Sequence, residues 1–272
     1  MSTLNGLVYA VRSRQMTKWS LSVGGLGLWL AAASCTASGP APGAGPAPDG
    51  SSSSAEAVQF TAKVVERNGG AAIPGARICV VDLSDIPCAT SASDGSYTIS
   101  MPVWTTDVDF AFNATAAGHL GSTWLLHEAP GDASWPTVQQ LYDDAAATDL
   151  MSHAGFAGPG GGKGSVLLSV YRASQGAAGM TVTSSPAGGG PVYLDPTGTP
   201  DPALTGLTTD GYALLGNLAP GPIEITVSDT SCTQTFLTNG SYFGMWADAK
   251  PATIAGVTVA DSITQMNMVC PP

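Results

Sequence analysis

From Val58 onward the sequence consists of short runs in which apolar and polar residues alternate, separated by clusters of glycine, proline, asparagine and aspartate. Alternation with a period of two is typical of β-strands that bury one face, and such turn residues end each strand after a few positions. The runs Phe60–Glu66 and Val108–Ala114 show it clearly. Glycine (34) and proline (20) together supply 54 of the 272 residues, which suits many turns and few long helices. The pattern predicts an all-β protein.

Two turn motifs organise the first β segment. Pro74-Gly75 comes before a strand at Arg77–Val81, and Asp94-Gly95 comes before a strand that begins at Tyr97. Glycine supplies the positive φ that such turns need. Over residues 58–123 this arrangement resembles the carboxypeptidase regulatory-like domain. The resemblance implies a seven-stranded, transthyretin-like sandwich and is nearly silent on function, because the module accompanies many surface proteins.

A weaker copy of the same motifs follows later in the chain. Ala178-Gly179 echoes the first turn, and Asp210-Gly211-Tyr212 repeats the second. We therefore predict a second sandwich over residues 164–272, with strands near Thr233–Leu237 and Val257–Val259 and a last strand that ends at Cys270.

Residues 124–163 interrupt the β pattern. A helix is predicted from Thr137, with Val138, Leu141 and Tyr142 on one face, and Gly158–Gly162 is predicted to be a linker. The expected fold is therefore two transthyretin-like or Ig-like antiparallel β-sandwiches with a short helical insert between them.

Residues 1–35 are interpreted as an export signal. Arg12, Arg14 and Lys18 precede the 13-residue apolar stretch Leu21–Ala33, which is too short to span a bilayer. The sequence that ends in Ser34-Cys35 resembles a bacterial lipobox, which implies a bacterial lipoprotein with a lipid on Cys35. Ordinary signal-peptidase cleavage stays open as the alternative, and so does a start at Met16 instead of Met1.

Residues 36–57 are rich in proline, glycine and serine and have no large apolar side chain. Such a segment cannot bury enough surface to offset its ordering entropy, so it is predicted to be a disordered tether. A tether directly after a lipidated cysteine would lift the β-sandwiches off a membrane. The expected location is the bacterial cell envelope, most simply the outer membrane, with the periplasmic or the exterior side left open.

Four cysteines remain when Cys35 is set aside. An even number in an exported chain indicates two disulfides, and four cysteines allow three pairings. We favour Cys79–Cys88 and Cys232–Cys270, one in each half. A metal site is disfavoured because the CxxC-type spacing and nearby histidines that zinc sites use are missing from the sequence.

The charge balance excludes one class of partner. Nine lysines and arginines against 20 acidic residues give a net charge of −11. Three of the nine basic residues lie in the export signal, so the mature chain carries 6 − 20 = −14. A chain this acidic repels phosphate backbones, and we expect no nucleic-acid binding.

Catalytic patterns are weak. The histidines His119, His127 and His153 occur without an HExxH motif, and no GxSxG elbow is present. Lys163 follows a glycine run but lacks the GxxxxGK[ST] order of a phosphate loop. We therefore expect neither an enzyme nor a cofactor.

Three further sites were weighed as ligand or modification sites. Met266 and Met268 could offer thioethers to Cu(I), but alternating apolar residues on a strand are usually core. Three aspartates fit the wet face of a helix better than a calcium loop: Asp143, Asp144 and Asp149. Asn113 begins a glycosylation sequon. We discount it as a modification site because the lipobox-like sequence implies a bacterial host.

The function predicted from these patterns is a structural, adhesive or protein-binding role, with the membrane and an unknown envelope protein or glycan as partners. The alternative is an accessory module that binds carbohydrate or a small ligand. Exposed aromatic side chains would favour the alternative, and buried ones would favour the structural role. The candidates are Trp104, Trp124, Trp135, Tyr142, Tyr242 and Trp246.

Overall fold

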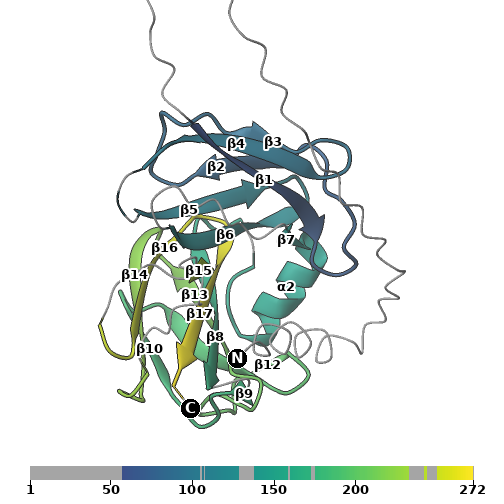
Figure 1. Ribbon diagram of the computed structural model, residues 1–272. Helices are drawn as coiled ribbons and strands as arrows, with labels where there is room; N and C mark the ends of the chain where they lie inside the picture. The colour runs from purple at the N-terminus through teal and green to yellow at the C-terminus, as the bar shows by residue number, and fades with distance from the viewer. Residues whose placement is uncertain are drawn as a thin grey trace, which may run out of the picture. The chain divides into compact units, whose positions relative to one another are not determined.

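The computed structural model describes residues 57–104, 106, 108–128, 138–158, 160–172, 175–232, 242–243 and 250–271 (Figure 1). The chain from residue 55 onward is one compact unit. Its described residues form strands, turns and one short helix, so the predicted all-β class is confirmed. The predicted strand near Thr233–Leu237 lies outside the described residues.

The first half of the unit is a sandwich of two sheets. One layer has the order β4-β1-β7, the other has the order β3-β2-β5-β6, and the end of β7 also pairs with the start of β6. Phe60, Ile78, Ile99 and Phe112 are fully buried between them. The strands are β1 (Ala57–Glu66), β2 (Arg77–Val80), β3 (Ala89–Thr90), β4 (Ser96–Pro102), β5 (Val108–Thr115), β6 (His119–Glu128) and β7 (Val138–Asp143).

The second half is a sandwich of the sheet β10-β14-β16 on the strands β12-β11-β13-β8-β17. Leu168, Leu215, Ile225 and Met266 lie in the core between these sheets. The strands are β8 (Gly164–Arg172), β9 (Gln175–Gly176), β10 (Val182–Ser185), β11 (Gly189–Leu194), β12 (Pro200–Asp201), β13 (Tyr212–Leu218), β14 (Gly221–Val227), β15 (Tyr242–Phe243), β16 (Thr253–Thr258) and β17 (Ser262–Cys270).

The two halves share one continuous sheet. Strand β17 lies between β6 and β8 and runs parallel to both. Among the described strands, β1 and β7 also pair in parallel, whereas the other pairings are antiparallel. Parallel pairing was not expected for these strands. Because β6 extends beyond residue 123, the predicted boundary at that residue falls inside a strand of the shared sheet.

The shared sheet buries both of its faces near the junction. On β5, Phe112 faces the first core and the neighbouring Ala111 faces the second. On β6, Leu126 faces the first core and Leu125 faces the second. Successive side chains of a strand point to opposite faces, so these two strands serve both cores.

Small polar side chains occupy the join between β5, β6 and β17. The side-chain amide of Asn113 donates to the hydroxyls of Ser262 at 2.8 Å and Thr123 at 3.0 Å. Gly121 lies where an added Cβ would stand 2.2 Å from the Ser262 hydroxyl oxygen, so only glycine fits this approach. The amide of the sequon residue Asn113 is therefore engaged in holding the two halves together.

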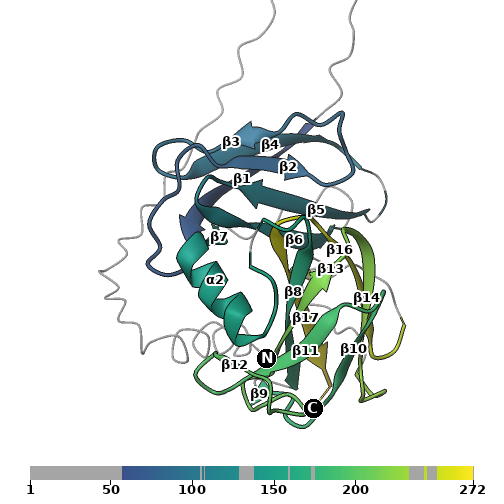
Figure 2. The same ribbon diagram turned by 180° about the vertical axis from the view of Figure 1, so that it is seen from behind.

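The predicted helix at Thr137 is wrong in its start. Residues Val138–Asp143 form β7, and the helix α2 spans Asp144–His153 (Figure 2). The Asp143 carboxylate caps the helix by accepting from the Ala146 amide at 2.8 Å. Leu141 is buried in the first core and Tyr142 lies beneath α2, so both faces of β7 are covered. Two adjacent apolar residues that point in opposite directions produced the apparent helical stripe.

The Asp94 carboxylate in the Asp94-Gly95 turn should make a pH-dependent contribution to the stability of the fold. The Asp94 carboxylate accepts from the Ser96 hydroxyl at 2.6 Å and the Ser96 amide at 3.0 Å, and these bonds lower its pKa to about 2. Because the pKa of Asp94 is lower in the folded protein than in the unfolded chain, its ionised form stabilises the fold at any pH above the unfolded-state pKa. This stabilisation is lost as the pH falls toward 2.

We expect Asp94→Asn to be less stable than the parent at about pH 6, with the difference shrinking by about pH 2.5. Urea unfolding at both pH values measures it. The Ser96→Ala variant should lose part of the same pH dependence, because Asp94 then keeps only one of its two bonds to residue 96. An equal difference at both pH values would contradict the assignment to Asp94.

Candidate functional site

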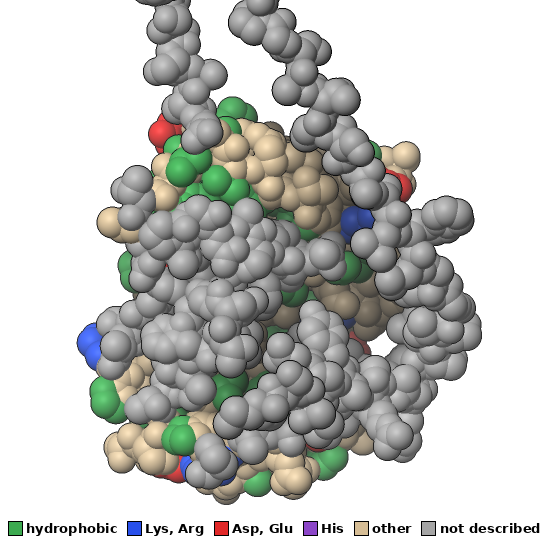
Figure 3. Space-filling view, viewed as in Figure 1, with side chains coloured by type: hydrophobic (Ala, Val, Ile, Leu, Met, Phe, Trp, Pro, Cys, Tyr) green, Lys and Arg blue, Asp and Glu red, His purple; other side chains and the backbone are tan. Residues whose placement is uncertain are grey.

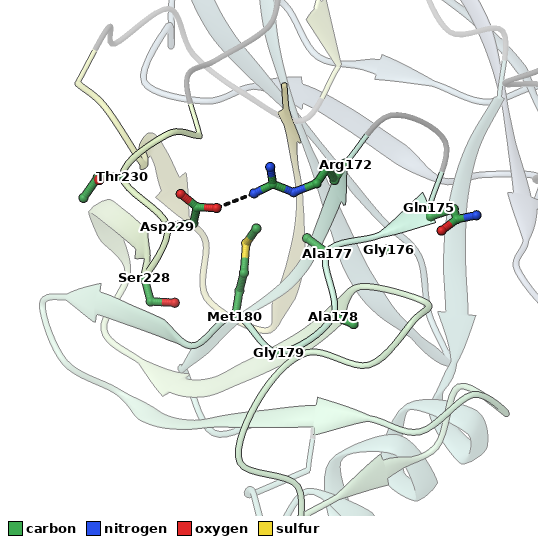
Figure 4. A pocket seen from close by; sticks show the side chains of 10 residues that line it. All are labelled: Arg172, Gln175, Gly176, Ala177, Ala178, Gly179, Met180, Ser228, Asp229 and Thr230. Carbon is green, nitrogen blue, oxygen red and sulfur yellow. Dashed lines mark hydrogen bonds and ion pairs between the residues drawn. The ribbon is translucent and has the colours of Figure 1, made fainter. Parts of the chain in front are cut away.

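A pocket of about 580 Å³ opens at the end of β8 in the second half (Figure 4). One wall is the turn from Gly176 to Met180, and the other is the segment Ser228–Thr230 that follows β14. Arg172, the last residue of β8, and Asp229 lie across its mouth from each other. The buried Met180 side chain points into the space between the walls.

The charged groups of the pocket are engaged with each other and with the protein. The Arg172 guanidinium donates to the Asp229 carboxylate and to the Pro271 carbonyl oxygen, the latter at 3.2 Å. The hydroxyl of Ser231 lowers the pKa of Asp229 most, followed by the Ser231 amide, which donates at 2.9 Å, and by Arg172. Asp229 is therefore ionised at neutral pH, where it pairs with Arg172.

The polar side chains that line the pocket are mainly hydroxyls, an amide and one ion pair. Ser228 and Thr230 supply the hydroxyls, and the lining includes no histidine, cysteine, lysine or tyrosine. Main-chain amides of its turn are used internally, as when Gly176 donates to Thr209 and Gly179 donates to Leu207. A small polar ligand would meet Gln175, Thr230 and the outer side of the ion pair.

Sequence reasoning missed this pocket. Arg172 and Asp229 lie 57 residues apart (229 − 172), and neither stands in a recognisable motif. The arginine at the end of an apolar strand was the single available signal.

Two of the three histidines have described side chains, and each lies near a carboxylate. His119 Nδ1 is 2.9 Å from the Ala117 carbonyl oxygen, and its buried Nε2 is 3.7 Å from the Glu66 carboxylate. His119 also lines a second pocket of about 360 Å³, together with Asp144 and Asp261. His153 is exposed at the end of α2 and lies 3.4 Å from Asp149. The side chain of His127 lies outside the described part.

Metal binding finds no support in the described part of the chain. Among the described residues, there is no group of three or more histidine, cysteine, aspartate or glutamate side chains that could hold a metal ion. Met266 and Met268 are fully buried in the second core, in line with the preferred interpretation. Asp143 and Asp144 serve the start of α2, and Lys163 is an exposed residue before β8.

Both predicted disulfides are present. Cys79 bonds Cys88 in the first half, and Cys232 bonds Cys270 in the second. The second bond is fully buried and lies beside the pocket, because the Cys232 sulfur is 3.9 Å from that of Met180. Cys35, the predicted lipidation site, lies outside the described residues.

Two of the three aromatic candidates with described side chains pack inward. Trp104 stacks on Phe60 at 5.9 Å between ring centroids, and Tyr142 is buried beneath α2. Trp124 is half-buried and donates to the Ser122 hydroxyl at 3.1 Å. Trp135, Trp246 and the side chain of Tyr242 lie outside the described part. On the face shown in Figure 3, the described side chains that are visible are mostly uncharged, with a few scattered acidic and basic ones.

No family model and no curated protein matches this chain. Among solved structures, a shaft pilin SpaA from Lactobacillus rhamnosus GG is 12% identical, with 79% of this chain and 97% of that chain covered and a TM-score of 0.24. The minor pilin of Streptococcus agalactiae is 12% identical, covering 78% and 95%, with a TM-score of 0.20.

A third similar structure is the Bacillus anthracis TIE protein, at 11% identity and a TM-score of 0.26. The match covers 79% of this chain and about a third (34%) of that protein's length. At these scores the likenesses carry no argument about function, and the fold class rests on the strands themselves. Within the described residues, no helix has both the length and the apolar character to cross a membrane.

Proposed function

We propose that this protein is a non-enzymatic, exported lipoprotein of the bacterial cell envelope with a structural, adhesive or protein-binding role. The observation that carries the proposal is the pair of disulfides. Disulfides form and persist in oxidising compartments outside the cytoplasm, and this structure contains one in each half. An exported chain fits the signal-like residues 1–35 and the cysteine at their end.

The chemistry of the described residues supports a binding or structural role. The charged residues of the larger pocket, Arg172 and Asp229, are paired with each other. Near the junction, polar groups such as Asn113 and Ser262 hold strands together. These polar contacts hold a rigid β framework together, and such a framework suits a protein that bears a load or presents a surface.

The finer assignment to carboxypeptidase regulatory-like domains rests on the turn motifs. The structure gives them a physical role, since Gly75 and Gly95 both have positive φ, as the motif requires. The module remains part of the proposal for the first sandwich, β1 to β7, with a second copy in the second sandwich.

Lipid anchoring is tested by labelling the full chain with an alkyne fatty-acid analogue in the bacterium that produces it. We expect label on the parent and none on Cys35→Ala, which should leave the membrane fraction and appear among soluble envelope proteins. The double variant Cys79→Ala/Cys88→Ala is the matched control and should keep the label. Equal labelling of the parent and of Cys35→Ala would show that Cys35 does not carry the lipid.

The carbohydrate-binding alternative is a separate proposal. Trp104 and Tyr142 pack inside the protein, so the described residues present no aromatic platform from these two side chains. A glycan array probed with the full chain decides it, and a blank array would remove the alternative.

A further inference from the structure

The loop of residues 79–88 between β2 and β3 is closed by the Cys79–Cys88 disulfide, and we call it the bridged loop. The flanking strands are already paired, with Arg77 opposite Thr90 and Ile78 opposite Ala89. Because the base of the loop is fixed by this pairing, the disulfide mainly restrains the loop itself.

The bridged loop is also held by both hydrophobic cores. Ile86 is buried in the first core, and its amide donates to the Leu83 carbonyl oxygen at 3.1 Å. Val81 donates from its amide to the Ala111 carbonyl oxygen at 2.8 Å and packs against the second core. The loop is thus anchored at the junction of the two halves, on either side of its tip.

The tip presents one apolar side chain between two acids. Leu83 is 39% exposed, and it is one of three exposed large apolar residues in the described part, with Val103 and Val138. Asp82 and Asp85 are exposed beside it, and residues 79–88 contain no lysine or arginine. The tip therefore carries two negative charges around an apolar centre.

The backbone at the tip turns through a left-handed residue. Asp82 has a φ of 61°, a conformation that aspartate adopts more readily than most other residues with a side chain. A single exposed leucine is ordinary on a protein surface. A leucine on a loop that is held by a disulfide and two core anchors is preorganised, and preorganisation lowers the entropy lost on binding.

We propose that the bridged loop is a docking element that inserts Leu83 into an apolar pocket of a partner protein whose rim carries lysine and arginine. The inference deepens the proposed protein-binding role and rests on it. The two aspartates select a basic rim by charge complementarity. The same charges disfavour the surface of an anionic membrane, and a leucine offers no ring face to a sugar.

The test uses the full chain, purified in detergent, as the target of a phage-displayed library of random disulfide-closed peptides. A random library samples the whole accessible surface, so enriched clones report the site best prepared for binding. We expect enriched peptides to combine apolar residues with lysine or arginine. Their affinity should fall about tenfold for Leu83→Ser, the loss typical of a central interface residue.

Two kinds of variant separate the loop from general stickiness. Val103→Ser and Val138→Ser remove the other exposed apolar side chains and should leave the affinity unchanged. Asp82→Asn/Asp85→Asn should weaken binding and reduce its salt dependence. Thermal unfolding of each variant verifies that it is folded.

Three outcomes would overturn the proposal: clones that bind Leu83→Ser as well as the parent, enriched peptides without basic residues, or no enriched clones. Failure here leaves the envelope assignment standing, because that assignment is decided by labelling at Cys35. Conversely, an unlabelled Cys35 would leave a positive result at the bridged loop intact.

Discussion

Replacing Cys232 and Cys270 together by alanine should lower the free energy of unfolding by about 4 kcal/mol. The bond closes a sequence separation of 38 residues, and the chain-entropy estimate for a loop of that length gives this value. Both sulfurs are buried in the second core, so alanine also leaves a small cavity there. Chemical denaturation of the parent and of Cys232→Ala/Cys270→Ala measures the difference.

The first disulfide supplies the matched comparison. Cys79–Cys88 spans nine residues between strands that are already paired, so Cys79→Ala/Cys88→Ala should cost about 2.5 kcal/mol at most. Cys79 and Cys88 are half-buried, whereas Cys232 and Cys270 are at most 1% exposed. Dithiothreitol should therefore reduce the first bond in the folded protein and reach the second only when the protein opens. A larger loss from the first pair would contradict this ranking.

Local patterns predicted the strands and turns well because each depends on a few neighbouring residues. The alternation in Phe60–Glu66 reports a strand with one buried face wherever that strand lies. Asp94-Gly95 and Asp210-Gly211 mark turns in which glycine takes a positive φ, as it does at both positions in the structure. The pairing of the cysteines followed from their even number and their distribution between the halves.

The arrangement of the strands could not be predicted in the same way. The placement of β17 between β6 and β8 brings together residues far apart in the chain, such as Asn113 and Ser262, which are 149 positions apart (262 − 113), and no local window reports such pairing. The double burial of β7 mimicked a helix because Leu141 faces the first core, built from distant strands, while the adjacent Tyr142 faces α2, which follows directly in the chain. The Arg172–Asp229 pocket likewise exists only once the strands are assembled.

Replacing Phe112 by alanine should cost about 3–5 kcal/mol, the range for removing a fully buried phenylalanine. Its ring packs edge-on against Phe110 at 5.4 Å and lies 5.9 Å from Phe60, so the cavity would open in the centre of the first core. Val138→Ala is the matched control, because Val138 is 36% exposed and its truncation should cost less than about 0.5 kcal/mol.

The effect of Phe112→Ala should extend into the second half. Ala111 and Leu125 reach the second core from the same two strands that line the first, and β6 is hydrogen-bonded to β17. Hydrogen–deuterium exchange should therefore show amides of β13 and β14 losing protection together with those of β1 and β4. Faster exchange confined to residues 58–123 would instead mean that the two sandwiches open independently, and the shared sheet would then be a contact between autonomous domains. Joint loss would mean that the two halves form a single cooperative unit, because neither half could open without the other.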